Sequence, residues 1–338
     1  MGDSAVRNGG GVAEGTLLWE PSADRVARAR ITGFLRWLAD RRGLVFTGYD
    51  DLWRWSVAHL EDFWSACWSY FEMGDEVDPA EVVRRGTGAE GARWFPGVSL
   101  NYVDGILRRP AADLALLAVG EEGEPMAISY GELLDRAGAV AAGLRRLGVG
   151  HGDRVAAVLG NGVEAVAGFL ATASLGAVWS SCAPEFGAAS MTDRFAQIAP
   201  KVLLCATGYR YGGRHFDLGP KLADLEGALP GLAAVVLVPG PQEAAAPAGA
   251  SGQGPARLWW DELASEPAPL APVAVGFEHP LWILYSSGTT GLPKPIVHGH
   301  GGIVLEHLKA AALHSDLGPG DRFFWFTTTG WMMWNFLL

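Results

Sequence analysis

A chain of 338 residues, of which 49% are hydrophobic, is long enough to form about two domains with a sizeable core. Its net charge of −11 leaves no electrostatic footprint for a nucleic-acid partner. The three cysteines are far apart and show neither a metal-binding spacing nor a secreted disulfide pattern, which fits a reducing cytoplasm. Composition therefore excludes nucleic acid as the partner and leaves a free nucleotide open.

The first hundred residues predict a helical layer. Ser22 can cap a helix that runs to about Arg42, and Asp50 can cap a second helix that ends near Phe71. The second helix carries large side chains at helical spacing, which are Trp53, Val57, Leu60, Trp64, Cys67 and Phe71. Seven of the 14 tryptophans lie before residue 100, and we expect them to pack this layer rather than to form a ligand cage.

From residue 113 the pattern changes to alternating strands and helices. We expect strands at 114–119, 155–159, 177–181, 201–205 and 233–238. The helices between them are expected at 129–148, 163–174 and 190–199, the first with a capping box of Ser129 and Glu132. Such repetition predicts an α/β fold in which helices cover both faces of a mostly parallel sheet.

Residues 165–184 carry no charge, which is long enough to raise the question of a membrane span. Glycines and serines interrupt this stretch at the places where a helix would give way to a strand. We therefore predict no membrane partner.

The turn at Gly160-Asn161-Gly162 is a candidate nucleotide site, because it follows a predicted strand and precedes a predicted helix as a dinucleotide fingerprint would. Glu185 lies roughly where a ribose-binding acid is wanted. However, Asn161 and Glu164 place a polar side chain and a negative charge where pyrophosphate should lie. A tight turn between strand and helix is the preferred interpretation, and a dinucleotide-dependent oxidoreductase remains an alternative.

The stretch 282–300, WILYSSGTTGLPKPIVHGH, joins a short apolar run to a loop of hydroxyls and glycines. The apolar run predicts a buried strand, which the glycines and Pro293 end. Glycines let the backbone approach a ligand, hydroxyls donate hydrogen bonds, and a lysine adds positive charge, as a phosphate-binding loop requires. The candidate residues are Ser286, Ser287, Gly288, Thr289, Thr290, Gly291 and Lys294. The common nucleotide-hydrolase loop is excluded, because prolines flank the lysine on both sides.

The order YSSGTTGLPK resembles the phosphate loop of the adenylate-forming superfamily, the acyl-CoA synthetases and their relatives. This resemblance implies that ATP, Mg²⁺ and coenzyme A take part, and that an acid is activated as its acyl-AMP. It also implies that Lys294 and the loop stabilise the negative charge that develops on the phosphates. One departure is Pro295, where most of the superfamily has glycine; proline lacks an N–H, so the phosphate contacts must be complete before it.

Three further segments extend the resemblance over nearly the whole chain. WFPGVSLNY (94–102) is similar to the N-terminal region of short-chain acyl-CoA synthetases, and SSCAPEFG (180–187) and TTTGWMMWN (327–335) are similar to acetoacetyl-CoA synthetases. A strand is expected at 322–329, and the Gly-Trp pair that follows matches the acyl-pocket segment of acetyl-CoA synthetases. The resemblance implies that the acid is bound by Trp331, Met332, Met333, Trp334 and Asn335. On composition alone, plain core packing is an equal alternative.

Two arginines flank a glycine pair in 209–215, and Arg214 resembles the arginine with which acetyl-CoA synthetases contact the phosphates of coenzyme A. The spacing is one residue longer here than in that family, so a solvated surface turn stays open as an alternative. His298 and His300 share a spacing that could place them on one strand face, but no cysteine or acid cluster completes a metal shell beside them. We predict no metal site on the protein itself.

The resemblance implies a helical N-terminal region over 1–110 and the first part of an AMP-binding domain over 111–338. Because the chain stops inside an apolar run, we expect it to be truncated, without the family's small C-terminal domain and catalytic lysine. The implied activity is the ligation of acetoacetate to coenzyme A, with ATP cleaved to AMP and pyrophosphate. Acetate or another short acid is the alternative substrate, and a nucleotide-binding fragment without turnover is the alternative of another class.

Overall fold

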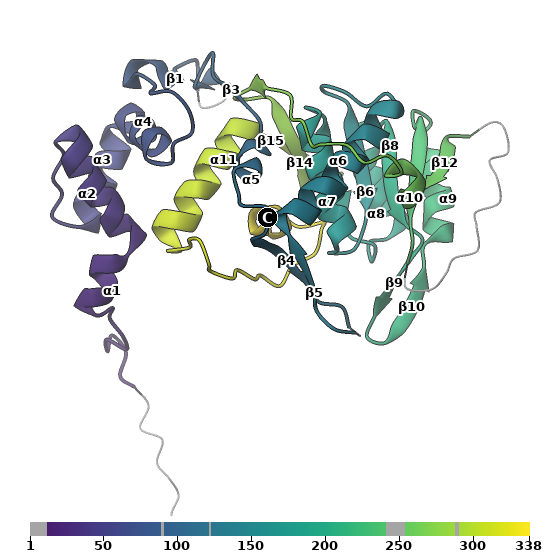
Figure 1. Cartoon of the computed structure of the whole chain (residues 1–338), viewed down its shortest axis with the longest axis horizontal. Helices are drawn as coiled ribbons and strands as arrows, with labels where there is room; N and C mark the ends of the chain where they lie inside the picture. Colours follow the sequence, from purple (N-terminus) through teal and green to yellow (C-terminus); the bar gives the residue numbers. More distant parts are fainter. Residues whose placement is uncertain (1–11, 89–90, 122, 241–253, 288–290) are drawn as a thin grey trace, which may run out of the picture.

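The computed structural model describes residues 12–88, 91–121, 123–240, 254–287 and 291–338. Its centre is a seven-stranded sheet in the order β12-β11-β8-β6-β7-β14-β15, in which every neighbouring pair is parallel except β14 and β15 (Figure 1). The strands are β6 Arg154–Val158, β7 Val178–Cys182, β8 Val202–Ala206, β11 Ala234–Val238, β12 Ala256–Trp259, β14 Pro280–Ser286 and β15 Lys294–Gly299. The predicted α/β class with a mostly parallel sheet is confirmed.

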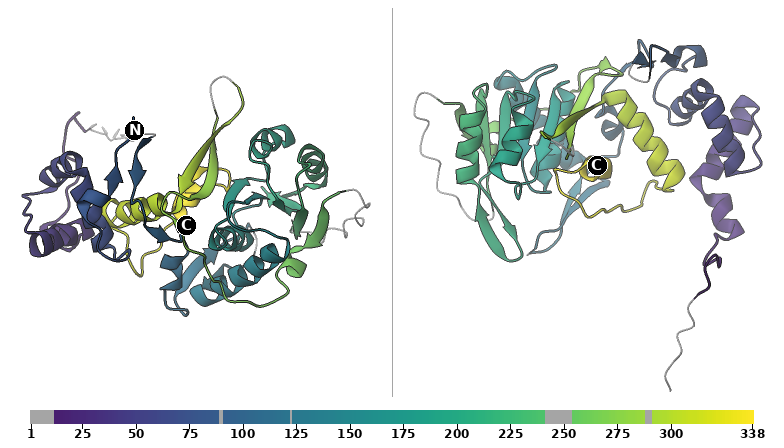
Figure 2. Two further views of the ribbon diagram at one scale, coloured as in Figure 1. Left: turned by 90° about the horizontal axis from the view of Figure 1, so that it is seen from above. Right: turned by 180° about the vertical axis from the view of Figure 1, so that it is seen from behind.

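Helices cover both faces of this sheet (Figure 2). On one face α6 (Tyr130–Arg146) packs against α7 (Val163–Ser174). On the other face α8 (Ala188–Phe195) packs against α9 (Gly219–Ala228). The connections β6 to β7 and β7 to β8 run in opposite directions along the sheet, and because such crossovers are right-handed they place α7 and α8 on opposite faces. The predicted capping box at the start of α6 is present, with Glu132 accepting from the Ser129 N–H at 2.8 Å.

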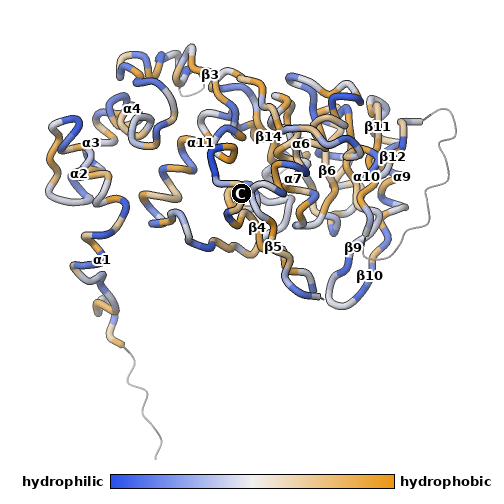
Figure 3. Tube along the Cα trace, in the orientation of Figure 1, coloured by the Kyte–Doolittle hydropathy of each residue, from blue (hydrophilic) through white to orange (hydrophobic). Residues whose placement is uncertain are grey.

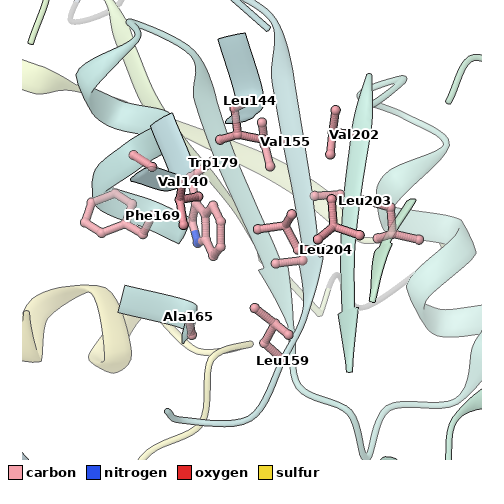
Figure 4. Packing of buried hydrophobic residues seen from close by; sticks show 14 of the residues in the cluster. Val140, Leu144, Val155, Leu159, Ala165, Phe169, Trp179, Val202, Leu203 and Leu204 are labelled. Carbon is pink, nitrogen blue, oxygen red and sulfur yellow. The ribbon is translucent and has the colours of Figure 1, made fainter. Parts of the chain in front are cut away.

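The main core lies between α6, α7 and the central strands, where Phe169, Trp179 and Leu204 are buried (Figure 4). At Gly168 a Cβ would lie only 2.9 Å from the Leu204 side chain, so this glycine lets α7 pack closely on the sheet. Apolar residues gather along the strands of the large sheet, whereas polar and apolar residues alternate in the N-terminal helices (Figure 3). The charge-free stretch is a helix followed by a strand, as predicted. Among the described residues, no helix has both the length and the apolar character to cross a membrane.

The N-terminal layer consists of α1 (Ala23–Arg28), α2 (Arg30–Arg42), α3 (Tyr49–Ala58) and α4 (Leu60–Tyr70). Two long helices were expected here, and that expectation is wrong. Ala29 has an extended ψ of 141° and His59 a ψ of 63°, so each expected helix is broken into two. Ser22 does cap α1, accepting from the Arg25 N–H.

The second break also changes which side chains are buried. Trp53 and Val57, two of the large side chains at helical spacing, are 54% and 64% exposed and do not lie in the core. The break between α3 and α4 changes the direction of the helix axis, so side chains on α3 no longer share a face with those on α4. On α4 the expected spacing does mark the buried face, because Cys67 is buried. Asp50 does not cap its helix either: Gly48 is the N-cap residue, and the aspartate lies inside the first turn. The layer has its own aromatic core around Phe34, Leu38, Trp68, Phe95 and Phe277.

Short elements surround the large sheet. The expected strand at 114–119 forms β4 (Leu114–Ala118), which pairs with β5 (Met126–Ser129) in a separate antiparallel hairpin and not in the large sheet. A second hairpin is β9 (Gly208–Tyr211) with β10 (Arg214–Asp217). The remaining elements are β1 Val83–Arg84, β2 Arg93–Trp94, β3 Ser99–Leu100, α5 Asp104–Leu107, α10 Trp260–Leu263, β13 Val275–Gly276 and α11 His300–Lys309, which a π-helical turn at Ala310–His314 continues.

The predicted strand at 322–329 is wrong. Residues 321–328 belong to no strand, and Phe324 and Phe326 are 75% and 88% exposed. Consecutive aromatic residues and threonines favour an extended backbone, but a strand also needs neighbouring N–H and C=O groups, which no described segment supplies here. The acyl segment that follows contains the short helix α12 (Met332–Leu337).

Candidate active site

The candidate site lies at the carboxyl edge of the large sheet. Because β6, β7 and β14 are parallel, their carboxyl ends meet at one edge, and the connections that leave β6 and β7 diverge to opposite faces. Ligand-binding crevices of open α/β sheets form where connections diverge in this way. Thr329 lies across this edge: its Oγ1 donates to the Leu159 carbonyl and its own carbonyl accepts from Ser181 Oγ, both at 2.7 Å.

The predicted phosphate loop joins β14 to β15 at this edge. The antiparallel register places Ser286 directly opposite Lys294, so the loop is the tip of a hairpin. Ser287 and Lys294 are exposed, and Ser286 is half-buried. Gly291 has a φ of 143°, a backbone conformation that favours glycine. Three of the candidate residues, Gly288, Thr289 and Thr290, lie outside the described residues.

The loop is anchored at both ends to the α8 segment. Tyr285, which directly precedes the loop, donates from its hydroxyl to the Arg194 carbonyl at 2.7 Å. At the other end, Gln197 Nε2 donates to the Pro293 carbonyl at 2.9 Å. Pro295 lies in β15, at the edge of the sheet, where the ladder tolerates a missing N–H.

The predicted acyl-binding residues divide into an exposed pair and a buried pair. Trp331 and Met332 are 63% and 55% exposed, Met333 is half-buried, and Trp334 and Asn335 are fully buried. A cavity of about 640 Å³ opens beside the far end of α12, lined among others by Tyr102, His307 and Phe336, but none of the five predicted residues lines it.

The two buried side chains have different environments. Trp334 stacks near Trp179 and donates from Nε1 to Asn161 Oδ1 at 2.9 Å. The turn at Gly160-Asn161-Gly162 therefore holds α12, which gives its asparagine a structural partner. The side-chain amide of Asn335 differs, because neither its Nδ2 nor its Oδ1 has a hydrogen-bond partner among the described residues.

Gly330 lies where the acyl segment meets the loop after β7. A Cβ on this residue would lie 2.9 Å from the Phe186 ring and 3.2 Å from the Ala183 nitrogen. The loop after β7 is held in place against Gly330, because Lys221 Nζ donates to the carbonyls of Pro184 and Phe186 at 2.7 and 2.8 Å. A glycine is thus required here by close approach.

Arg214 lies on the β9–β10 hairpin, which Figure 1 shows apart from the β14–β15 hairpin. Its guanidinium lies 5.5 Å from the Phe216 ring centre. At the hairpin tip, the N–H groups of Gly212 and Gly213 donate to the Glu121 carboxylate at 2.6 and 2.9 Å, and Arg210 Nε lies 3.7 Å from the same group. These N–H bonds lower the pKa of Glu121. The tip therefore binds an anion, which here is a carboxylate of the same chain.

The two histidines after the loop do not share a strand face. His298 is in β15, where its Nδ1 accepts from Trp282 Nε1 at 2.9 Å. His300 begins α11, and its Nδ1 accepts from the Tyr102 N–H at 3.1 Å. Within the described ranges, no group of three or more His, Cys, Asp or Glu side chains is placed to hold a metal ion.

Comparison with known proteins identifies most of the chain. Residues 107–337 match the family described as AMP-binding enzyme, and residues 49–104 match the family described as acetyl-coenzyme A synthetase N-terminus. The chain belongs to the AMP-binding enzyme family. The adenylate-forming resemblance of the phosphate loop is thereby confirmed.

Proteins similar to this chain include acetoacetyl-CoA synthetases. The protein of that name from Rhizobium meliloti (strain 1021) is 40% identical over 321 residues, which cover 95% of this chain and 49% of the relative. The structure of acetoacetyl-CoA synthetase from Streptomyces lividans has a TM-score of 0.87 at 48% identity, over 94% of this chain and 49% of that one. Malonamoyl-CoA synthetase from Penicillium aethiopicum is 36% identical over 95% of this chain and 46% of its own length. The chain spans about half the length of the relatives it matches.

Several side chains at the candidate site have no signal in the sequence. Asn161, Arg194 and Lys221 each act through a partner that is far away along the chain. The turn at Asn161 has the spacing of a dinucleotide fingerprint, and a single sequence does not show that Trp334 of α12 contacts this asparagine. Phe186, in contrast, lies inside SSCAPEFG, a segment that carries the family resemblance.

Proposed function

We propose that this chain forms the nucleotide- and acid-binding part of a ligase that joins acetoacetate to coenzyme A through an acyl-adenylate, with ATP cleaved to AMP and pyrophosphate. The observation that carries the proposal is the meeting of two segments at one sheet edge. The phosphate loop leaves β14 there, and Thr329 fixes the acyl segment across the ends of β6 and β7. The relatives named acetoacetyl-CoA synthetases support the choice of acid.

The loop residues fit the phosphates of ATP. Lys294 presents an exposed ammonium group at the end of the hairpin, opposite Ser286, and Ser287 adds an exposed hydroxyl. A lysine offers a phosphate a point charge with three donors, and a glycine with positive φ lets the backbone approach it. Mg²⁺, when bound with the nucleotide, supplies further positive charge to the phosphates.

In the proposed reaction the acid carboxylate attacks the α-phosphate and pyrophosphate leaves. Lys294 and the hydroxyls of the loop stabilise the negative charge that builds up on the departing phosphates. The thiol of coenzyme A then attacks the acyl carbonyl and AMP leaves. The chain's contribution is to hold acid and nucleotide in reacting geometry, which is worth several kcal/mol when the reacting atoms are aligned.

The acyl segment is proposed to select an acid with a carbonyl group β to its carboxylate. Acetoacetate and malonamate, the acids in the names of two relatives, both have a carbonyl at that position. Trp331, Met332 and Met333 are proposed to form an adaptable apolar wall, with Trp334 fixing the helix behind it. Asn335 has an amide N–H without a partner in the described chain, which a carbonyl oxygen would satisfy.

The β9–β10 hairpin is the proposed contact for the phosphates of coenzyme A, with Arg214 as the exposed cation. Its tip already binds a carboxylate through two N–H groups, which supports an affinity for anions. The chain is proposed to act in the cytoplasm on small molecules. We further propose a domain division near residue 110, because the described residues form two separate apolar cores, one built mainly from residues 34–100 and one mainly from residues beyond 103.

The match of residues 49–104 to the acetyl-coenzyme A synthetase N-terminus favours acetate as the second candidate acid. The two acids are separated by comparing acetoacetate, acetate and butyrate in an assay of acid-dependent exchange between pyrophosphate and ATP. A preference for acetate would move the proposal to that activity.

Lys294→Ala tests the phosphate loop. We expect acid-dependent exchange to fall by about tenfold or more, because one cation facing the leaving phosphates is lost, while the thermal midpoint stays the same. Lys309→Ala is the matched control, since that lysine lies on α11 and pairs with Glu306. Because the chain spans about half of its relatives, the exchange assay is run on this chain and on a form extended to the relatives' length, and MgATP binding is measured on both. Unchanged exchange in Lys294→Ala would refute its assignment.

A further inference from the structure

Three neighbouring side chains, Phe186, Arg194 and Tyr285, connect the acyl segment to the phosphate loop, and this row is called the stack below. The Arg194 guanidinium carbon lies 5.2 Å from the ring centre of Phe186 and 5.8 Å from that of Tyr285. Both distances are within the range of cation–π contacts. Phe186 belongs to the loop after β7, and Tyr285 is the last residue before the hydroxyls of the phosphate loop begin. One guanidinium therefore contacts both sides of the site.

Arg194 is held in this position by its own helix. Its Nη1 donates to the Ser190 carbonyl at 2.7 Å and to the hydroxyl of the same residue, one turn earlier in α8. In the described chain its polar partners are thus a carbonyl and a hydroxyl, not a carboxylate. The flat guanidinium is left to contact the two rings.

The segment at the same end of α8 forms hydrogen bonds with both ends of the phosphate loop. The hydroxyl of Tyr285 donates to the Arg194 carbonyl, and Gln197 reaches the Pro293 carbonyl at the other end of the loop. The Tyr285 hydroxyl is protonated at neutral pH, and burial raises its pKa further, to about 12. The side chain and the backbone of Arg194 therefore both contact Tyr285, the residue that directly precedes the loop.

On the opposite side, the stack ends against the acyl segment. The Phe186 ring lies so close to Gly330 that a Cβ there would be 2.9 Å from it, and Lys221 holds the loop backbone behind the ring. Contacts thus run without interruption from Gly330 through Phe186 and Arg194 to Tyr285. A displacement of the acyl segment by a bound acid would press on the ring and, through the guanidinium, on the base of the phosphate loop.

We propose that Arg194 is a positioning residue that holds the phosphate loop in register with the acyl segment, and that it acts through the planar contact of its guanidinium with both rings rather than through charge alone. The proposal rests on the proposed function, in which these two segments bind nucleotide and acid. It predicts that acid and nucleotide influence each other's affinity through this stack.

Hydrogen exchange of this chain without nucleotide tests the stack itself. Arg194→Met removes the charge and the plane, and Arg194→Lys keeps the charge but loses the plane that stacks on two rings. We expect both variants to speed exchange of β14–β15 amides about 5- to 30-fold, the loss of two cation–π contacts. Arg257→Lys, on β12 at the far edge of the sheet, is the matched control and should leave the hairpin unchanged. Wild-type exchange in Arg194→Lys, or in both variants, would overturn the proposal.

A second measurement separates this inference from the proposed function. MgATP affinity is determined by calorimetry with and without acetoacetate, for the wild type and both variants. We expect acetoacetate to change the wild-type Kd and to leave the Kd of either variant unchanged, a loss of coupling that a general loss of stability would not produce. Wild-type coupling in the variants would overturn the proposal. No MgATP binding by the wild type would instead refute the proposed function. The hydrogen-exchange rates would then still show whether Arg194 stabilises the β14–β15 hairpin. Phe186→Leu removes one ring and replaces Arg194→Met if that variant does not fold.

Discussion

Replacing Asn335 by leucine should stabilise the fold but weaken the reaction with acetoacetate. One substitution therefore separates a binding role of Asn335 from a structural one. The Asn335 side chain is fully buried, and neither amide atom has a partner among the described residues. A buried unsatisfied polar group costs about 1 to 3 kcal/mol, and leucine has nearly the same size without that cost. We therefore expect Asn335→Leu to raise the free energy of unfolding by about 1 to 3 kcal/mol, measured by urea denaturation.

The same change should weaken the reaction with acetoacetate. If the amide N–H binds the ketone oxygen, its loss costs about 1 to 3 kcal/mol of discrimination, or about 5- to 150-fold in the specificity constant. Butyrate, which has the chain length without the ketone, should lose much less in the exchange assay. Asn101→Leu is the control for stability, because both side-chain atoms of that buried asparagine have partners: Nδ2 donates to the Ala173 and Val273 carbonyls, and Oδ1 accepts from the Val103 N–H. The loss of these three bonds should destabilise the fold. Equal losses with both acids would refute the binding role of Asn335.

Three further substitutions test other parts of the structure. Burial, with His279 and His151 nearby, lowers the pKa of His300 to about 3, so between pH 6.5 and pH 3 the unfolded chain binds more protons than the folded chain. The free energy of unfolding should therefore fall by up to about 1.4 kcal/mol for each pH unit as the pH drops from 6.5 towards 3. In His300→Gln, the free energy of unfolding measured by urea denaturation should depend less steeply on pH. Gly330→Ala should lower the free energy of unfolding by about 1 to 3 kcal/mol by displacing the Phe186 ring, whereas Gly302→Ala, with open space around it, should not; equal midpoints in a urea titration would show that the ring yields freely. Glu121→Gln removes the charge that occupies the β9–β10 tip, and calorimetry should show a lower Kd for coenzyme A; an unchanged Kd would mean that this tip is only a surface turn.

Sequence reasoning succeeded where structure depends on neighbours along the chain. The helix expected at 163–174 has those bounds as α7, and the Ser129 capping box is present, because periodic apolar residues and a cap act within one or two turns. The hydroxyls and glycines after Tyr285 do end a buried strand, and the hairpin that results places Lys294 beside Ser286.

It failed where tertiary contacts decide. Nothing in the local pattern marks Ala29 or His59 as a break, since both are tolerated inside helices, and only packing of the shorter helices selects the interruption. The segment 322–329 has the aromatic residues and threonines that are common in strands, but pairing is a property of two segments, and no strand pairs with it in the described chain. The link between Asn161 and Trp334 spans 173 positions, and a single sequence does not show such a pair.

The burial of all three thiols turns the cysteines into built-in reporters of local opening. Cys67 lies in the aromatic core of the N-terminal layer, whereas Cys182 and Cys205 lie in the core of the large sheet. Burial raises the pKa of each thiol, to about 12 for the latter two, so almost no thiolate is present in the closed state and alkylating reagents must wait for the chain to open. The alkylation rate of Cys67 relative to the other two would therefore measure whether the N-terminal layer unfolds before the sheet, without any label being introduced.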